Sequence, residues 1–235
     1  MWTPLLLAGA SIIGLGGGGL LTRIISHFIP RKLPHIFVIC GGMLVGIILF
    51  EMLPHSIMEY DIKGIIIGLL TGYVIMQLID YILHSSEDTY VSHKALGFLI
   101  TGLFFHHIIM GFSYGAATLS NSKPFLTAIM LHQIPEGIAI MTALLLARLS
   151  VWFYLNMIII LSVTLGVSAL LGETVKGTSF RIDTLLTGIA IGTLVFVTFH
   201  EIIGKSKNNF KWRTLGIMIL IGMGLIKIYL LMLGL

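Results

Sequence analysis

The chain has 235 residues, of which 57% are hydrophobic and 10% charged, and its formal net charge is +4. A soluble domain carries roughly 25% charged residues, and a soluble core of this composition would leave far too much apolar surface in water. We therefore predict a polytopic membrane protein embedded in the lipid bilayer, with no nucleic-acid partner indicated by so small a positive charge. The single cysteine, Cys40, excludes an internal disulfide and a thiolate cluster.

Eight apolar segments follow one another, each close to the length of about 20 residues that crosses a bilayer. They cover approximately residues 4–28, 33–56, 62–84, 95–116, 123–147, 151–172, 182–204 and 211–233. Because the connections are short, we expect helices that are neighbours in the sequence to pack antiparallel. The predicted fold is an all-α, eight-transmembrane-helix bundle, formed by a single transmembrane domain over residues 1–235.

Orientation is predicted from the excess of Lys and Arg in cytoplasmic loops. One side of the bundle carries most of the basic residues, namely Arg23, Arg31, Lys32, Lys94, Arg148, Lys205, Lys207, Lys211 and Arg213. The other side carries Lys63, Lys123, Lys176 and Arg181. The first side is therefore predicted to be cytoplasmic, which places both termini outside, as an even number of spans requires.

The first segment has no basic leader and no clear cleavage site, so we predict a retained span rather than a signal peptide. It contains Gly14-Leu-Gly-Gly-Gly-Gly19, which lacks the Lys-Ser/Thr ending and the preceding strand of a phosphate loop. Small residues let helix backbones approach closely. The glycines therefore predict a packing face, with a flexible joint as the alternative. A compact chain without disulfides favours a cell membrane of the bacterial inner-membrane type.

The fourth and fifth segments carry ionisable residues at membrane depth, where such residues are costly unless they are paired or face a polar cavity. His132 and Glu136 are four residues apart, as are His106 and Met110, so the members of each pair share one helical face. His107 points about 100° away from His106. Residues of this kind at this depth are typical of an ion path.

If these two helices are neighbours, His106, His132 and Glu136 are predicted to converge near the bilayer midplane. Two imidazoles and a carboxylate suit a borderline divalent cation such as Zn²⁺, and Met110 adds a soft thioether. Pro135 has no N–H and is expected to kink the helix beside them. The alternative is that each histidine is a satisfied polar residue at a helix interface.

A second set of polar residues lies at the predicted cytoplasmic ends. Asp80 and His84 in the third segment fall at the same depth as His200 and Glu201 in the seventh. Together they are candidates for a metal-release site. Because adjacent residues do not share a helical face, only one of His200 and Glu201 is expected to face such a path.

Glu51 and His55 are four residues apart at the predicted outer end of the second segment. They are either an entry site for metal or a polar pair at a helix end. Glu59 and Asp61, which follow them, are interpreted as a solvated loop.

Two motifs resemble those of the ZIP (Zrt/Irt-like) metal transporters. His132-Gln-Ile-Pro-Glu-Gly137 resembles the family's fifth-segment motif, and His106-His-Ile-Ile-Met-Gly111 resembles its fourth-segment motif, usually His-Asn-x-x-Asp/Glu-Gly. Phe199-His200-Glu201 is also similar to the family pattern, and the resemblance extends over the whole chain. It implies transport of a divalent metal into the cytosol, typically zinc, iron or manganese, with cadmium as a further candidate, through the ligands His106, His132 and Glu136.

The chain departs from the family pattern at three positions of this site. Met110 stands in place of the acidic ligand of the fourth segment, His107 in place of the Asn, and Gln133 at an acidic or amide position of the fifth. His107 and Gln133 remain candidate ligands beside Met110. The sixth segment has no carboxylate at depth, so only Glu136 remains to bridge two ions, and we predict one metal per protomer.

Two other functions stay open. His200-Glu201-Ile-Ile-Gly204 resembles the start of the His-Glu-x-x-His motif, but Gly204 replaces the second histidine. The main prediction is a metal transporter that is not an enzyme. One alternative is an intramembrane metal-dependent hydrolase with Glu136 as base. The other is a proton or small-solute carrier with a His/Glu relay. Whether metal crosses the membrane, and whether activity needs metal, would distinguish them. A homodimer is common among such bundles, although no dimer motif stands out.

Overall fold

The computed structural model describes residues 3–83, 93–116, 123–174 and 180–232. These residues form long helices. They are α1 (Thr3–Phe28), α2 (Leu33–Ile47), α3 (Leu53–Glu59), α4 (Ile62–Leu83), α5 (His93–Ala116), α6 (Lys123–Leu146), α7 (Val151–Thr174), α8 (Phe180–Phe196) and α9 (Trp212–Met232). A 3-10 turn, η1 (Pro30–Lys32), precedes α2, and π-helical segments η2 (Ile48–Met52) and η3 (Val197–Gly204) continue α2 and α8.

Seven of the described helical stretches are long and apolar enough to cross a membrane. One of them runs without interruption from Pro30 to Glu59. Within it, Pro54 lies just after the π-helical segment η2. α6, which carries the polar fifth-segment motif, has 24 residues and is an eighth long helix beside these seven. Helices satisfy every backbone polar group internally, as lipid requires. The prediction of an all-α polytopic membrane protein is confirmed.

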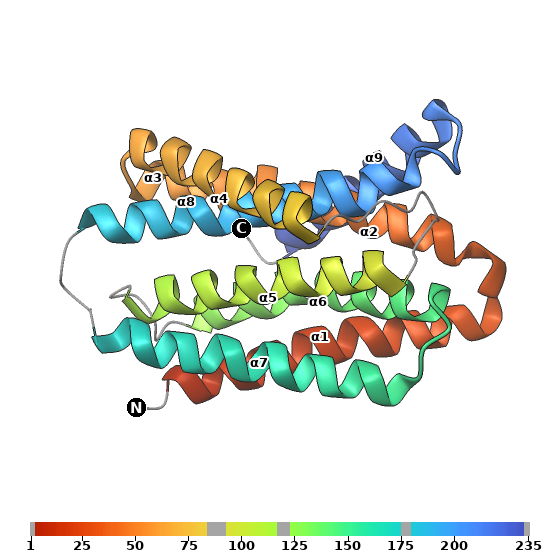
Figure 1. The fold of residues 1–235 in the computed structure, drawn as a ribbon, viewed down its shortest axis with the longest axis horizontal. Helices are drawn as coiled ribbons and strands as arrows, with labels where there is room; N and C mark the ends of the chain where they lie inside the picture. The colour runs from red at the N-terminus through yellow and green to blue at the C-terminus, as the bar shows by residue number, and fades with distance from the viewer. Residues whose placement is uncertain (1–2, 84–92, 117–122, 175–179, 233–235) are drawn as a thin grey trace.

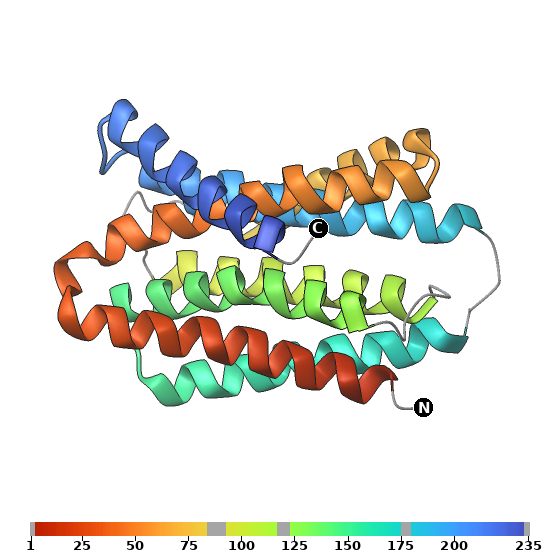
Figure 2. The same cartoon turned by 180° about the vertical axis from the view of Figure 1, so that it is seen from behind.

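The helices lie in two layers (Figure 1). One layer contains α1, α5, α6 and α7, and the other contains α2, α3, α4, α8 and α9, as the view from behind also shows (Figure 2). Within the layers, α1 packs on α6, α5 on α7, α4 on α8 and α2 on α9; α5 with α8 and α2 with α6 join the two layers.

The expectation that sequence neighbours pack side by side is wrong. α5 and α6 contact each other far less than they contact α7 and α1, respectively. A short connection requires only that two helix ends meet. Side-by-side contact is decided by faces of small residues that let backbones approach.

Glycines form one such face between α1 and α6. A Cβ at Gly18 would collide with the backbone of Ile134, and a Cβ at Gly137 would collide with the backbone of Leu15. At Gly17, by contrast, a Cβ would meet no atom within 4 Å. The prediction that the glycines of the first segment form a packing face is confirmed.

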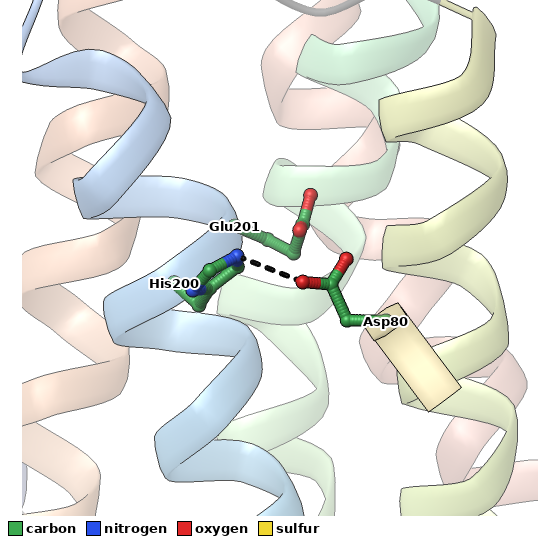
Figure 3. A group of neighbouring side chains, drawn as sticks. All are labelled: Asp80, His200 and Glu201. Carbon is green, nitrogen blue, oxygen red and sulfur yellow. Dashed lines mark ion pairs between the residues drawn. The ribbon is translucent and has the colours of Figure 1, made fainter. Parts of the chain in front are cut away.

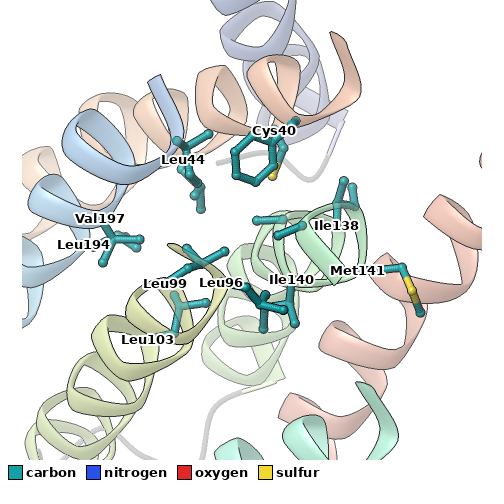
Figure 4. Packing of buried hydrophobic residues seen from close by; sticks show 14 of the residues in the cluster. Cys40, Leu44, Leu96, Leu99, Leu103, Ile138, Ile140, Met141, Leu194 and Val197 are labelled. Carbon is teal, nitrogen blue, oxygen red and sulfur yellow. The ribbon is translucent and has the colours of Figure 1, made fainter. Parts of the chain in front are cut away.

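The main apolar core lies between the layers (Figure 4). Leu44 from one layer and Leu99 and Ile140 from the other belong to one cluster of buried side chains, which Val197 of η3 completes. Nearby, the buried thiol of Cys40 in α2 donates a hydrogen bond to the carbonyl of Pro135 in α6, at a sulfur–oxygen distance of 2.7 Å. The core therefore holds the two layers together beside the polar motif.

Candidate metal centres

The site predicted near the bilayer midplane is formed by one turn of α5 and one turn of α6, and we call its residues His106, His107, His132 and Glu136 the midplane centre. His106 and His107 lie in α5, and His132 and Glu136 lie one turn apart in α6, with Pro135 inside the helix. All four of these polar side chains are almost completely buried. Although α5 and α6 make few contacts overall, they meet at this point.

Glu136 lies between the two adjacent histidines. Its Oε1 is 3.6 Å from His106 Nε2, and its Oε2 is 3.5 Å from His107 Nε2. Neither carboxylate oxygen accepts a hydrogen bond from any described residue. His106 and His107 diverge, with ring planes at 86°, and both reach Glu136 because the carboxylate projects between them.

His106 is oriented from α8, in the other layer. Its Nδ1 is 2.9 Å from the carbonyl oxygen of Ala190 and 3.3 Å from Thr193 Oγ1. Because a carbonyl can only accept, Nδ1 carries the proton in this arrangement and Nε2 presents a lone pair. That lone pair faces the Glu136 carboxylate. Two electron-rich groups opposed in a buried site are stabilised by a cation between them.

His107 is part of a hydrogen-bonded network. Its Nδ1 is 2.7 Å from the carbonyl oxygen of Leu103, and its Nε2 is 3.0 Å from Gln133 Oε1. Ser11 of α1 donates to the same Gln133 oxygen over 3.1 Å, and Ser162 of α7 donates to Ser11 over 3.0 Å. The network connects all four helices of this layer. Both ring nitrogens of His107 and the side-chain oxygen of Gln133 therefore already have hydrogen-bond partners in this network.

His132 contacts the residue that replaces the expected carboxylate. Its Nε2 is 3.2 Å from Met110 Sδ, and Met110 is buried. Among the described residues, the ligand atoms of His106, His132 and Glu136 do not all lie within 4.8 Å of one another. A single ion held by all three therefore requires a side-chain rotation, for which the flexible thioether of Met110 leaves room.

A second centre brings α4 and η3 together (Figure 3). Asp80, His200 and Glu201 each offer a ligand atom, and these atoms lie within 4.8 Å of one another. This is the one such group of His, Cys, Asp and Glu in the described part of the chain. His200 Nε2 is 3.3 Å from Asp80 Oδ2, and the His200 ring stacks on Phe196 with centroids 4.7 Å apart. We call Asp80, His200 and Glu201 the inner centre.

His200 and Glu201 both reach Asp80, although adjacent residues of an α-helix do not share a face. Both residues lie in the π-helical segment η3. A π-helix hydrogen-bonds from i to i+5, which changes the directions of successive side chains relative to an α-helix. His200 is largely exposed and Glu201 is buried, yet both reach Asp80. His84, the fourth residue predicted for this centre, lies outside the described residues.

The predicted outer residues, Glu51 and His55, lie in two consecutive helical segments, η2 and α3. Glu51 lies in η2, whereas His55 Nδ1 is 3.1 Å from Glu59 Oε2 on the same helix. Glu59 therefore ends α3 and is not part of a loop. The structure supports a polar pair at a helix end, made by His55 and Glu59.

Several residues that contact the two centres were not predicted from the sequence, among them Ser11, Ser162 and Lys205. Ser11 and Ser162 contact the midplane centre through Gln133, and single serines in apolar helices gave no signal. Lys205 lies beside the inner centre, with its Nζ 2.8 Å from Glu201 Oε2. The spacing of four residues between Glu201 and Lys205 is typical of a salt bridge on one helical face, so this contact was predictable from the sequence.

A family model described as ZIP Zinc transporter matches residues 82–230. The chain belongs to the ZIP zinc transporter family. It is 25% identical over 130 residues to Zinc transporter 3 of Oryza sativa subsp. japonica, covering 52% of this chain and 36% of that protein. It is 22% identical over 133 residues to Zinc transporter 8 of the same plant, covering 52% of this chain and 34% of the relative. The chain thus spans about a third of the length of these curated relatives.

In this ZIP protein the matched range contains the whole midplane centre and two residues of the inner centre, His200 and Glu201. Asp80 lies two residues before the range begins. Family membership and the long apolar helices agree on a multi-pass membrane protein. The positions at which this chain departs from the family pattern, Met110, His107 and Gln133, all touch the midplane centre.

Proposed function

We propose that this ZIP protein carries a divalent metal ion, zinc first, across the membrane toward the cytosol. The observation that carries the proposal is the buried Glu136 carboxylate, which accepts no hydrogen bond from the described residues and faces the Nε2 lone pair of His106. A buried carboxylate in lipid is functional by default. The two rice relatives named zinc transporters favour zinc as the cargo.

In the proposed midplane site the metal lies between His106 Nε2 and Glu136, and His132 turns from Met110 to become the third ligand. Imidazole and carboxylate suit Zn²⁺ and related borderline ions. One carboxylate against a doubly charged ion leaves a net positive charge of about one. The site therefore holds a single metal without neutralising it, and such a site releases its ion readily.

Release toward the cytosol is proposed to pass the inner centre. Asp80, His200 and Glu201 offer an oxygen-rich set at which the ion regains water before it leaves. Alternating access requires two packings of the bundle around the midplane site. Pro135 inside α6 and the glycine contacts between helices are the elements proposed to permit them.

The test is zinc flux into proteoliposomes loaded with a zinc-sensitive dye, for wild type, Glu136→Gln and His132→Ala, with manganese, iron and cadmium measured in parallel. We expect saturable flux in wild type and no flux above empty vesicles in either variant, because each variant removes one ligand. Glu173→Gln changes the same charge on a partly exposed residue of α7 and should behave as wild type. Wild-type flux in Glu136→Gln would contradict the proposal. Bound metal without flux of any ion would favour the hydrolase alternative.

A further inference from the structure

Lys205 brings a fixed positive charge to the inner centre. Its ammonium is 2.8 Å from Glu201 Oε2, which is a salt bridge between residues four apart. The same ammonium lies over the ring of Phe98 in α5, 5.9 Å from the ring centroid. The lysine is thus held from two directions, by a carboxylate of η3 and by an aromatic face of α5.

The carboxylate that Lys205 contacts is also a candidate metal ligand. The Glu201 side chain is only 2% exposed in this pair, whereas the Lys205 side chain is 24% exposed. The other oxygen, Glu201 Oε1, is buried and has no hydrogen-bond partner among the described residues. A buried carboxylate needs a cation or hydrogen bonds, and Lys205 satisfies only one of its two oxygens.

A helix salt bridge alone does not account for this arrangement. An exposed pair at this spacing is worth only a few tenths of a kcal/mol. Here the Glu201 carboxylate is buried within reach of Asp80 and His200. The Lys205 ammonium already lies against this carboxylate, and its positive charge repels a metal ion that approaches the same group. Lys205 and a divalent ion would compete for the same carboxylate.

We propose that Lys205 is a resident competing cation of the inner centre. Its ammonium pairs with Glu201 when no metal is present, and an arriving divalent ion displaces it. When the ion leaves, the ammonium returns to Glu201. The competition lowers the affinity of the inner centre and speeds release. This inference rests on the proposed role of Asp80, His200 and Glu201 as a release site.

The experiment measures Zn²⁺ binding by titration calorimetry to the purified full-length protein, in a Glu136→Gln background that removes the midplane site. Lys205→Gln deletes the charge, Lys205→Arg keeps it, and Lys207→Gln deletes the charge of an exposed lysine two residues away. We expect Lys205→Gln to lower the Zn²⁺ Kd of the inner centre about tenfold. The other two variants should bind as the parent does. In the protein that keeps Glu136 and therefore transports, Lys205→Gln should also lower the maximal rate of zinc flux.

Two further variants separate the possible outcomes. Asp80→Asn should abolish binding at the inner centre; if it leaves the Kd unchanged, the release site itself is wrong and the role of Lys205 is wrong with it. If Asp80→Asn abolishes binding but Lys205→Gln leaves the Kd unchanged and only lowers the unfolding temperature, the release site stands and Lys205 is a structural partner. If Lys205→Gln does not fold, Lys205→Met removes the charge but keeps an unbranched apolar side chain, and the same outcomes apply to it.

Discussion

The orientation of the His106 imidazole depends on α8, a helix of the other layer. His106 belongs to α5, but its Nδ1 proton is directed by Ala190 and Thr193 of α8. That contact turns the lone pair of Nε2 toward Glu136, and this geometry favours the proposed role of His106 as a ligand over that of a helix-packing histidine. Outer contacts of this kind commonly fix the tautomer of a metal-binding histidine.

Met110 is the residue at which metal preference should be adjustable. Met110→Glu restores a carboxylate beside His132, and hard ions prefer oxygen ligands. We expect the ratio of manganese to cadmium flux to rise about tenfold. Met110→Leu keeps an apolar side chain and removes the sulfur, and it should reduce cadmium flux without favouring manganese. Parallel uptake assays with the two metals measure the ratio. An unchanged ratio in Met110→Glu would mean that Met110 only fills space.

At the scale of the element, the two π-helical segments each carry a carboxylate of interest, Glu51 in η2 and Glu201 in η3. π-helical turns are rare and frequently occur at functional sites. In η3 the altered turn brings two adjacent residues to the same partner, Asp80, which an ordinary α-helix disfavours. A helix that looks regular in sequence thus acquires a local binding geometry.

The contact between α1 and α6 predicts opposite effects for two neighbouring glycines. Gly18→Ala places a methyl group against the backbone of Ile134, and we expect a loss of about 1–3 kcal/mol in the free energy of unfolding. Gly17→Ala meets no atom within 4 Å and should be neutral or slightly stabilising, because alanine favours helix. Denaturant unfolding in detergent measures both. Equal stability of the two variants would contradict the close approach of α1 and α6.

For the whole molecule, the predicted orientation can be tested with the protein's one cysteine left in place. Cys40 is fully buried, so its background labelling should be low. Asp61→Cys is expected to react with a membrane-impermeant maleimide on intact cells, because that loop is predicted to lie outside. Asn209→Cys should react only after permeabilisation, since it lies between the basic residues Lys207 and Lys211. The reverse pattern would invert the predicted topology.

The membrane class, the helical fold and the residues of the midplane motif followed from the sequence alone. Hydrophobicity over a span is a local property of the chain, and lipid leaves helices as the main way to satisfy the backbone. The spacing of His132 and Glu136 likewise sets a shared face whatever surrounds the helix. The release set was predicted for the same reason, because Asp80, His200 and Glu201 lie at comparable depths in their segments.

Only the tertiary structure decided which helices pack together and where each side chain points. Contact between α1 and α6, or between α4 and α8, depends on matching surfaces far apart in the sequence, and no short segment encodes that match. The direction of the His106 proton needed α8, and the convergence of His200 and Glu201 needed the π-helical turn. The competing cation at Lys205 emerged only when Glu201 was seen to be buried, because burial is what turns a helix pair into a strong partner.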